Sequence, residues 1–351
     1  MDGVLVVNAG STSLKLHVVA ADDTVRTVEA LDEIDPSEVD AVAHRVVHGG
    51  SRFRDAVVID EAVHEEIFEL EPLAPLHNAP ALEGVDAARL ALPAIPHVAV
   101  FDTSFHRTIP AEAATYAIPL RWREEWGVHR YGFHGLSVEW STRRVPELLG
   151  SPVERLVVCH LGGGSSVTAV RAGRSVDTTM GFSPLEGVPM TTRSGSVDPG
   201  ALLYLLRERG LGAEELDHAL NFDSGLNAVA GTSGGMRELE DRLRAGNAAA
   251  TAAFDVFVHR VAGAVAAMAA AAGGLDVVAF TAGIGEGSAL VRLHVCKRLR
   301  FLGVELDEAH NADAAPDCDV ATAGSRVRVV VVRAREELVA AEAARRVLGA
   351  S

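Results

Sequence analysis

Two turns of small residues, one in each half of the chain, have the composition of a loop that binds an anion. The first, Asn8–Ser13, lies between the apolar runs of Val4–Val19, and Lys15 follows it with a mobile positive charge. The second lies within R-L-V-V-C-H-L-G-G-G-S-S-V-T-A-V, Arg155–Val170. Such turns bring backbone N–H groups and hydroxyls close to an anion, because no bulky side chain intervenes. The repeated strand–turn–strand pattern predicts a duplicated fold with a phosphate-bearing ligand held between two domains.

Four further side chains could act on an anionic substrate. Arg45 and Arg193 each carry a guanidinium fork that can bind a carboxylate or phosphate through two hydrogen bonds. Asp102 follows a predicted strand, where α/β proteins often place reactive groups, although capping a turn is also an ordinary role there. His134 is flanked by glycine-rich sequence in G-F-H-G. A single arginine or histidine is more often structural, so the residue types alone leave both roles open.

Apolar runs and breaker residues predict the elements that would position these side chains. Besides the two hairpins, strands are expected over residues 24–30, 41–47, 97–101, 275–280 and 326–332. Helices are expected over 59–70, 81–92, 137–149, 201–209, 213–220, 247–272 and 336–348, and one more from 289, with loops over 177–199 and 221–235. Strands joined by helices indicate an α/β protein of two domains, with a boundary at Gly150–Pro152 and the terminal helix returning to the first domain.

Length and composition limit the class of protein. The 351 residues suffice for two domains with cores, and the formal net charge of −16 argues against a nucleic-acid partner, which requires a basic face. The three cysteines form no C-x-x-C pair, which is compatible with a reducing compartment. The start of the chain lacks the basic region of a signal peptide. The apolar run Val261–Leu275 is too short to span a bilayer and predicts a buried helix. We therefore expect a soluble, cytoplasmic protein with no membrane partner.

Several motifs, taken together and in order, resemble the acetate kinase family of the actin/sugar kinase/Hsp70 superfamily. They run from Asn8 to Glu337: N-A-G-S-T-S-L-K, H-R-V-V-H-G-G, L-A-P-L-H-N, V-F-D-T-S-F-H, R-Y-G-F-H-G, P-L-E-G, T-R-S-G and F-T-A-G-I-G-E. The resemblance implies two duplicated actin-like (ribonuclease H-like) α/β domains with a nucleotide cleft between them. The expected limits are 1–150 plus 336–351 for the acyl and phosphate domain, and 151–335 for the nucleotide-binding domain. It also implies a homodimer.

The resemblance implies a reaction as well: reversible, magnesium-dependent phosphoryl transfer from ATP to acetate, giving acetyl phosphate and ADP by direct in-line transfer. Phosphoryl transfer needs two anions aligned and their charge offset, more than covalent help from the protein. By this resemblance Arg45 binds the acyl carboxylate and Arg193 the transferring phosphoryl group. Asp102 is the essential acid, which orients substrate or arginine, and His134 donates to the phosphoryl group in the transition state.

Nucleotide and metal positions also follow from the resemblance. Asn8 and Glu336 correspond to the metal site, for Mg²⁺ with Mn²⁺ as an alternative, and Lys15 would assist the phosphates. The remaining positions expected to bind ATP or ADP are Ser11, Ser13, His160, Leu161, Gly162, Gly163, Gly164, Gly235, Met236, Arg237, Gly283, Ile284, Gly285, Glu286 and Gly287. Met236 could instead fill the core.

An acyl pocket lined by Val47, Leu76, Phe133 and Pro184, beside Arg45, would discriminate substrates by volume. One methylene changes binding by only about 1–3 kcal/mol, so Val47 would favour acetate over propionate without excluding it. A propionate or butyrate kinase is therefore the first alternative. A nucleotide-binding regulator without catalysis is the second, and the retained catalytic residues argue against it.

The departures from the family pattern lie on the nucleotide side or the periphery. Gly163 and Gly287 each replace a usual asparagine, and Gly235 replaces an acidic residue. The usual P-T-N before the two glutamates is R-A-R, Arg333–Arg335, and the segment between the first hairpin and Arg45 is shorter than usual. These changes concern nucleotide binding, while the acyl and phosphoryl residues are intact.

Overall fold

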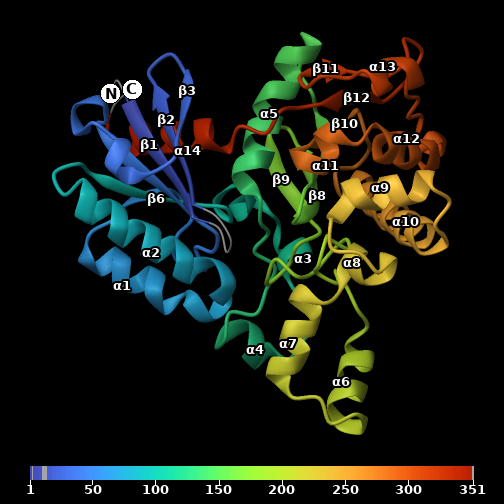
Figure 1. Cartoon of the computed structure of the whole chain (residues 1–351), viewed down its shortest axis with the longest axis horizontal. Coiled ribbons are helices and arrows are strands. Elements are labelled where there is room, and N and C mark those ends of the chain that lie inside the picture. The colour runs from blue at the N-terminus through green and yellow to red at the C-terminus, as the bar shows by residue number, and fades with distance from the viewer. Residues whose placement is uncertain (2, 10–13, 350–351) are drawn as a thin grey trace. The chain divides into compact units, whose positions relative to one another are not determined.

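The computed structural model describes residues 1, 3–9 and 14–349, which pack into two compact units (Figure 1). Unit 1 consists of Met1–Thr108, Tyr116–Trp140 and Arg335–Ser351, and unit 2 of Ile109–Thr115 and Ser141–Ala334. The chain enters unit 2 after Thr108, returns after Thr115, enters unit 2 again inside a helix after Trp140, and returns to unit 1 after Ala334. The predicted limits at 150/151 and 335/336 stay a prediction, which differs from these units in residues 109–115, 141–150 and 335.

The sheet of unit 1 begins with the predicted N-terminal hairpin. Its strands lie in the order β3 (Val25–Val28), β2 (Leu14–Ala20), β1 (Gly3–Ala9), β4 (Ala41–Val46), β6 (His97–Phe101) and β5 (Val57–Val58). The first three strands are antiparallel neighbours, whereas β1, β4 and β6 run parallel and β5 is antiparallel to β6. The strands predicted at 24–30, 41–47 and 97–101 are thus confirmed.

The sheet of unit 2 repeats this topology strand for strand. Its order is β11 (Cys318–Asp319), β12 (Arg328–Val331), β10 (Val277–Thr281), β7 (Arg155–Leu161), β8 (Ser165–Arg171) and β9 (Arg174–Thr178). Again three antiparallel strands are followed by parallel neighbours of the first strand and an antiparallel edge strand. The duplication predicted from the two hairpins is confirmed.

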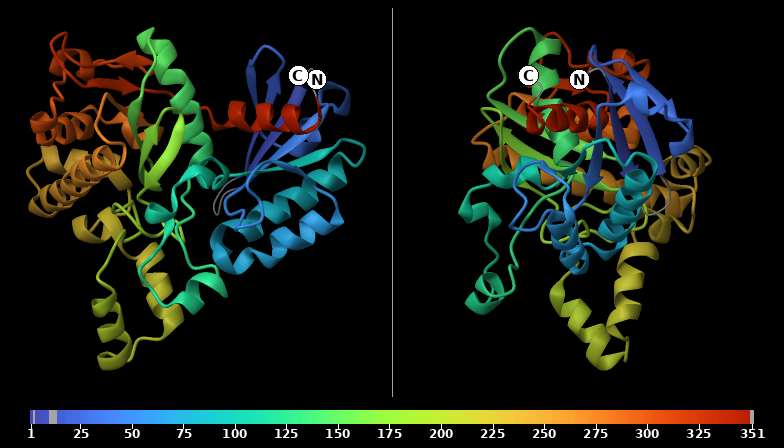
Figure 2. Two further views of the ribbon diagram at one scale, coloured as in Figure 1. Left: turned by 180° about the vertical axis from the view of Figure 1, so that it is seen from behind. Right: turned by 90° about the vertical axis from the view of Figure 1, so that its left-hand side faces the viewer.

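Helices cover both faces of the unit 1 sheet because β1 alternates its side chains between the faces. Val4 and Val6 pack in one cluster with Val339 of α14 (Glu336–Val347), while Leu5 and Val7 pack in another with Ala88 of α2 (Pro75–Ala91). Figure 2 shows α14, in red, against the blue strands of this sheet. The terminal helix therefore belongs to unit 1, as its predicted return to the first domain requires.

The helix predicted over 81–92 begins earlier, at Pro75. Proline suits the first turn of a helix, where its missing N–H has no partner in any case. Pro80 lies inside the helix, so the sequence pattern suggested an interruption where the helix continues. The remaining helices of unit 1 are α1 (Glu61–Glu69), α4 (Leu120–Glu124) and the start of α5 (Gly135–Leu149).

Unit 2 is built around α10 (Ala248–Ala271), whose Phe254, Phe257 and Val261 join the strands in one buried cluster. Among the described residues α10 alone is long and apolar enough to cross a membrane, and half of that apolar stretch is buried in the fold. The other helices are α3 (Ala111–Ala114), α6 (Pro199–Glu208), α7 (Ala213–Phe222), α8 (Gly225–Ala230), α9 (Gly235–Arg244), α11 (Ala282–Gly287), α12 (Ala289–Arg298) and α13 (Glu308–Ala312). Short 3₁₀ turns occur at Leu31–Glu33, Pro36–Glu38, Glu71–Leu73, Ser104–Thr108 and Arg300–Leu302. The predicted loop 221–235 is wrong in part, since it contains α8.

Candidate active site

Arg45 lies at the centre of a cluster of predicted site residues in unit 1. Its Nε donates to Asp102 Oδ1 at 3.0 Å and its Nη2 to Asp102 Oδ2 at 2.5 Å, which is the bidentate arrangement of an arginine fork. Its Nη1 donates to Asn8 Oδ1 at 3.0 Å, and Glu336 Oε2 lies 3.7 Å from Nε. Four residues therefore meet at one guanidinium, although the outermost two, Asn8 and Glu336, are 328 positions apart in the sequence.

The sheet explains why three of these residues meet. Asn8 and Arg45 lie near the ends of the parallel neighbours β1 and β4, and Asp102 follows β6. Parallel neighbours end at the same edge of a sheet, where open α/β sheets bind their ligands. Glu336 joins them because it is the first residue of α14, which packs along the same sheet.

Neighbouring carboxylates keep Arg45 protonated, and its hydrogen bonds orient it. Burial lowers the pKa of Arg45, but the negative charges of Asp102 and Glu336, with the hydrogen bonds to Asp102, outweigh burial and raise it. Asp102 is 1% exposed, whereas 18% of the Arg45 side chain remains accessible. Asp102 therefore serves as an internal support for a guanidinium that still has an accessible side.

His134 is tied to Asp102 through the backbone. Gly135 N donates to the carbonyl oxygen of Asp102 at 2.8 Å, and a Cβ at Gly135 would lie only 2.1 Å from that oxygen. His134 has a φ of 59°, a left-handed conformation that non-glycine residues seldom adopt and that tends to occur at functional sites. The glycine after His134 thus allows a close approach of two backbone segments, which links His134 to the aspartate that supports Arg45.

The predicted acyl-pocket residues are only partly described. Val47 and Phe133 are buried in unit 1, at 6% and 1% exposure. The side chain of Leu76 lies outside the described residues, and Pro184 belongs to unit 2. The pocket itself stays a prediction.

Two residues in the quoted motifs support this region, although the sequence did not single them out. The amide of Asn78 both accepts from His48 N and donates to His48 O, at 3.1 Å each. The ring of His48 meets Tyr131 and Phe133 edge-on, with centroids 4.5 and 5.4 Å apart. Their places in H-R-V-V-H-G-G and L-A-P-L-H-N were the signal that could have identified them.

Arg193 lies in the loop before α6 of unit 2. Its Nη1 donates to the carbonyl of Pro184 at 3.3 Å and contacts Met190 Sδ at 4.0 Å. Burial lowers its pKa, although a guanidinium stays protonated. Thr191 N donates to the carbonyl of Gly163 at 3.3 Å, so the loop that carries Arg193 is joined to the second glycine turn.

The second glycine turn connects β7 to β8. His160 and Leu161 are buried at the end of β7, and Gly162 N donates to Gly164 O at 2.9 Å. A Cβ at Gly162 would lie 3.6 Å from Ala282, whereas one at Gly163 would meet nothing within 4 Å. The tip at Gly163 is therefore open, as a phosphate-binding turn requires.

The other predicted nucleotide positions fall into three groups. Gly283–Gly287 forms the short helix α11, in which a Cβ at Gly283 or Gly287 would meet nothing within 4 Å, and Gly285 packs against Phe280. Gly235, Met236 and Arg237 begin α9, with Met236 in the core cluster and Arg237 exposed. Lys15 is exposed on β2 opposite Asn8. Ser11 and Ser13 lie outside the described residues.

The metal site expected at Asn8 and Glu336 stays a prediction. Asn8 Oδ1 accepts from Arg45 Nη1, and Glu336 Oε2 lies 3.7 Å from Arg45 Nε, so both residues bring an oxygen to the same guanidinium. Mg²⁺ typically takes one or two protein oxygens and keeps several waters. Within the described part of the chain no group of three histidine, cysteine, aspartate or glutamate residues could hold a metal by itself. A cation here would accordingly depend on substrate phosphates and water for its remaining ligands.

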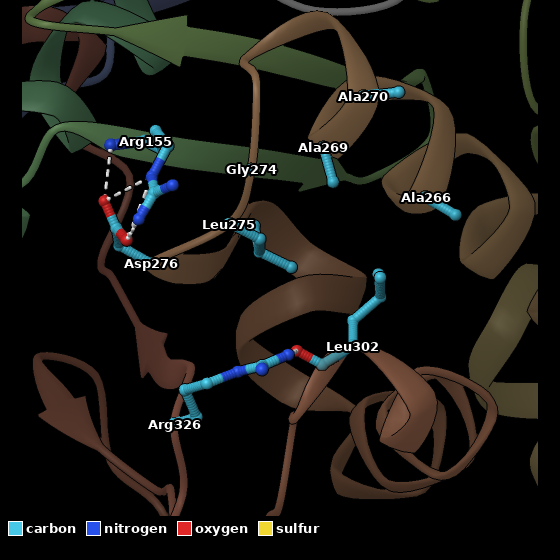
Figure 3. A pocket seen from close by; sticks show the side chains of 9 residues that line it. All are labelled: Arg155, Ala266, Ala269, Ala270, Gly274, Leu275, Asp276, Leu302 and Arg326. Carbon is cyan, nitrogen blue, oxygen red and sulfur yellow. Dashed lines mark hydrogen bonds and ion pairs between the residues drawn. The ribbon is translucent and has the colours of Figure 1, made fainter.

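A cavity of about 510 Å³ lies at the other end of β7 (Figure 3). Its charged groups are already engaged: Arg155 pairs with Asp276 at 2.5 Å, and Arg326 Nη2 donates to the carbonyl of Leu302 at 2.7 Å. None of the predicted site residues lines it.

Known proteins resemble this chain over nearly its whole length. It matches the pattern of the Acetokinase family over residues 26–342. It is 46% identical over 333 residues to an acetate kinase of Microcystis aeruginosa, which covers 94% of this chain and 83% of that protein. An acetate kinase of Synechococcus sp. is 48% identical over 314 residues, covering 89% and 77% of the two chains.

Solved structures agree in fold. A propionate kinase from Francisella tularensis superposes with a TM-score of 0.92 at 32% identity, and covers 99% of this chain and 100% of its own. An acetate kinase from Porphyromonas gingivalis gives 0.88 at 34% identity with the same coverage. The prediction of two actin-like α/β domains is confirmed by this agreement, while the nucleotide cleft stays a prediction. The family match and these relatives, together with the residues around Arg45, establish that the chain belongs to the acetokinase family.

Proposed function

We propose that this protein is an ATP-dependent acetate kinase, which transfers a phosphoryl group reversibly between ATP and acetate. The support is the family and the named relatives. The observation that carries the proposal within the chain is the guanidinium of Arg45, held by Asp102 and Asn8 beside Glu336. A fixed, partly accessible guanidinium in an otherwise acidic protein suits a small carboxylate substrate.

The catalytic roles follow from the chemistry of each group. Arg45 would bind the carboxylate of acetate in a set orientation, and Asp102 would hold Arg45 without contacting the reacting atoms. His134 and Arg193 would donate hydrogen bonds to the transferring phosphoryl group, whose charge spreads over its oxygens in the transition state. Both arginines would offset negative charge. In direct in-line transfer the acetate oxygen would form its bond to phosphorus as the bond to the ADP oxygen breaks, with no covalent intermediate on the protein.

A divalent cation, Mg²⁺ with Mn²⁺ as an alternative, would be held by Asn8 and Glu336. When bound, it would neutralise phosphate charge and orient the phosphates of the nucleotide. Lys15 and the turn Gly162–Gly164 would bind phosphates through their N–H groups. Gly283, Ile284, Gly285 and Gly287 of α11 and the start of α9 would contact the rest of ATP or ADP.

The setting of the enzyme is also a proposal. We expect a cytoplasmic homodimer that takes small-molecule substrates and binds neither nucleic acid nor a membrane. Sedimentation of the purified protein tests the dimer, since a single species at the monomer mass would contradict it.

A series of acyl substrates tests the activity and its specificity together. Purified protein, ATP, Mg²⁺ and hydroxylamine are combined with acetate, propionate or butyrate, and acyl hydroxamate is measured for kcat/KM. We expect acetate to give the largest kcat/KM. If none of the three acids gives hydroxamate, the proposal is refuted. ATP binding without turnover would favour a nucleotide-binding regulator instead.

A propionate kinase is the second candidate, because a propionate kinase is among the similar structures. Val47, which is 6% exposed and lies two residues after Arg45 in the sequence, is the residue expected to limit acyl size. A larger kcat/KM for propionate than for acetate would select this alternative.

A further inference from the structure

The chain leaves unit 2 along a path that is anchored at three successive residues. After β12 it runs through Arg333 and Ala334 and enters unit 1 (Figure 1). Val332 N donates to Phe280 O, Arg333 N donates to Asp317 Oδ1, and Ala334 N donates to Glu286 Oε1, each at 2.9 Å. A proline at position 333 would carry no N–H and could not donate the bond to Asp317.

Glu286 joins this path to the start of α11. The same oxygen, Oε1, accepts from Ala282 N at 3.1 Å. Ala282 has a φ of 66°, and the side chain of Thr281, at the N-cap, does not cap the helix. The strained turn from β10 into α11 would otherwise leave the N–H of Ala282 without an acceptor. Glu286 supplies that acceptor.

The other end of α11 is fixed by a buried arginine. Arg292, 1% exposed, donates through Nη1 to the carbonyls of Gly285 and Glu286, at 2.9 and 2.7 Å. Its Nε and Nη2 bind Asn311 at 2.7 and 3.0 Å. The backbone of Glu286 is therefore held in place independently of its side chain, and the carboxylate works from a rigid base.

Asp317 holds a second crossing of the chain. Its Oδ2 accepts from Nε of Arg144 at 3.0 Å, and Arg144 lies on α5 four residues after Trp140, where the chain enters unit 2 inside this helix. One carboxylate therefore anchors both α5 and Arg333 inside unit 2. The segment Val332–Ala334, which Glu286 holds at Ala334, is therefore fixed by hydrogen bonds to other parts of unit 2.

We propose that Glu286 is a positioning residue that fixes the G-I-G-E turn to Ala334, the last residue of unit 2 before the chain enters unit 1. Ala334 lies two residues before Glu336, which begins α14 and lies 3.7 Å from Arg45. A single oxygen thereby fixes both the G-I-G-E turn, expected to bind nucleotide, and the start of the segment that carries an expected metal ligand. This role rests on the proposed acetate kinase function, and it assigns Glu286 to backbone support in place of nucleotide contact.

The two roles predict different behaviour of a glutamine variant. Both bonds end on Oε1, so Glu286→Gln can reproduce them without the charge, whereas Glu286→Ala cannot. A glutamate that acts on nucleotide or metal through its charge would lose its function in either variant. Glu305→Ala is the matched control, because Glu305 is exposed and uses only its backbone in hydrogen bonds.

Amide hydrogen exchange tests the anchor without reference to activity. We expect the N–H groups of Ala282 and Ala334 to exchange faster in Glu286→Ala than in wild type. They should keep their protection in Glu286→Gln and in Glu305→Ala. Unchanged exchange of both amides in Glu286→Ala would overturn the proposal.

Kinetics test the consequence for the reaction. Loss of a supporting residue commonly lowers activity or metal affinity about 10- to 100-fold, and we expect such a fall in kcat for Glu286→Ala, with Glu286→Gln restored to near wild type. A Glu286→Gln variant that folds but is as inactive as Glu286→Ala would overturn the proposal, even if the alanine variant fails to fold. Wild-type protein without acetate kinase activity, but with the expected exchange pattern, would refute the proposed function and leave the anchor standing.

Discussion

Replacing Asp102 by alanine should be among the most damaging single changes in unit 1. It removes both acceptors of the Arg45 fork, at 3.0 and 2.5 Å, from a position that is 1% exposed. Removing one partner of a buried ion pair costs about 3–5 kcal/mol. Because 18% of the Arg45 side chain is exposed and Glu336 lies 3.7 Å away, we expect a smaller loss of unfolding free energy, about 2–3 kcal/mol.

The effect on activity should exceed the effect on stability. Without Asp102 the guanidinium can turn toward Glu336, and misplacing a binding group by about 1 Å can cost about 100-fold in rate. Urea unfolding gives the first quantity and the hydroxamate assay gives kcat/KM. Asn8→Ala is the graded control, because it removes one hydrogen bond to Arg45, worth about 1 kcal/mol. A folded Asp102→Ala variant that keeps wild-type kcat/KM would refute the role of Asp102 as the support of Arg45.

Three further predictions concern backbone space, pH and acyl size. Gly135→Ala should lower stability by about 1–3 kcal/mol because its Cβ would lie 2.1 Å from the Asp102 carbonyl, whereas Gly163→Ala, with an open position, should unfold at the wild-type urea concentration. Burial lowers the pKa of His106 from 6.5 to about 4, so as the pH falls His106 is protonated in the unfolded chain before it is protonated in the folded chain. Unfolding free energy measured in urea should therefore fall on acidification from pH 6.5 toward 4, by up to about 1.4 kcal/mol per pH unit from this residue, and His106→Gln should reduce that slope. Val47→Ala should raise the ratio of kcat/KM for propionate over acetate by about 10-fold or more; an unchanged ratio would remove Val47 from the acyl pocket.

Asn8, Arg45 and Asp102 could be predicted to lie together because they stand at or just after the ends of strands. Apolar runs mark β1, β4 and β6, and the polar residues near their ends must gather at one edge if the strands are parallel. Glu336 could not be found this way, since its distance from Arg45 depends on how α14 packs on the sheet. Its assignment came from resemblance to a family.

The errors have local physical causes. Pro75 and Pro80 suggested an interruption, but a proline in the first turn costs little, so α2 starts at Pro75. The stretch Gly283–Gly287 looked like a turn because glycine is a poor helix former. Glu286 and Arg292 hold it as α11 through bonds to its ends, and neither bond has a signature in the sequence.

The sequence by itself determines the duplicated hairpins, the strands joined by helices, and the residue types that could bind a carboxylate and a phosphate. These features are local, because they depend on alternation, small residues and the ends of strands. Only the tertiary structure decides that Asp102 supports Arg45, that Gly135 joins His134 to Asp102, and that Glu286 holds both α11 and Ala334. Each of these contacts joins segments that packing brings together. Burial strengthens such a hydrogen bond or ion pair because the local dielectric constant is low.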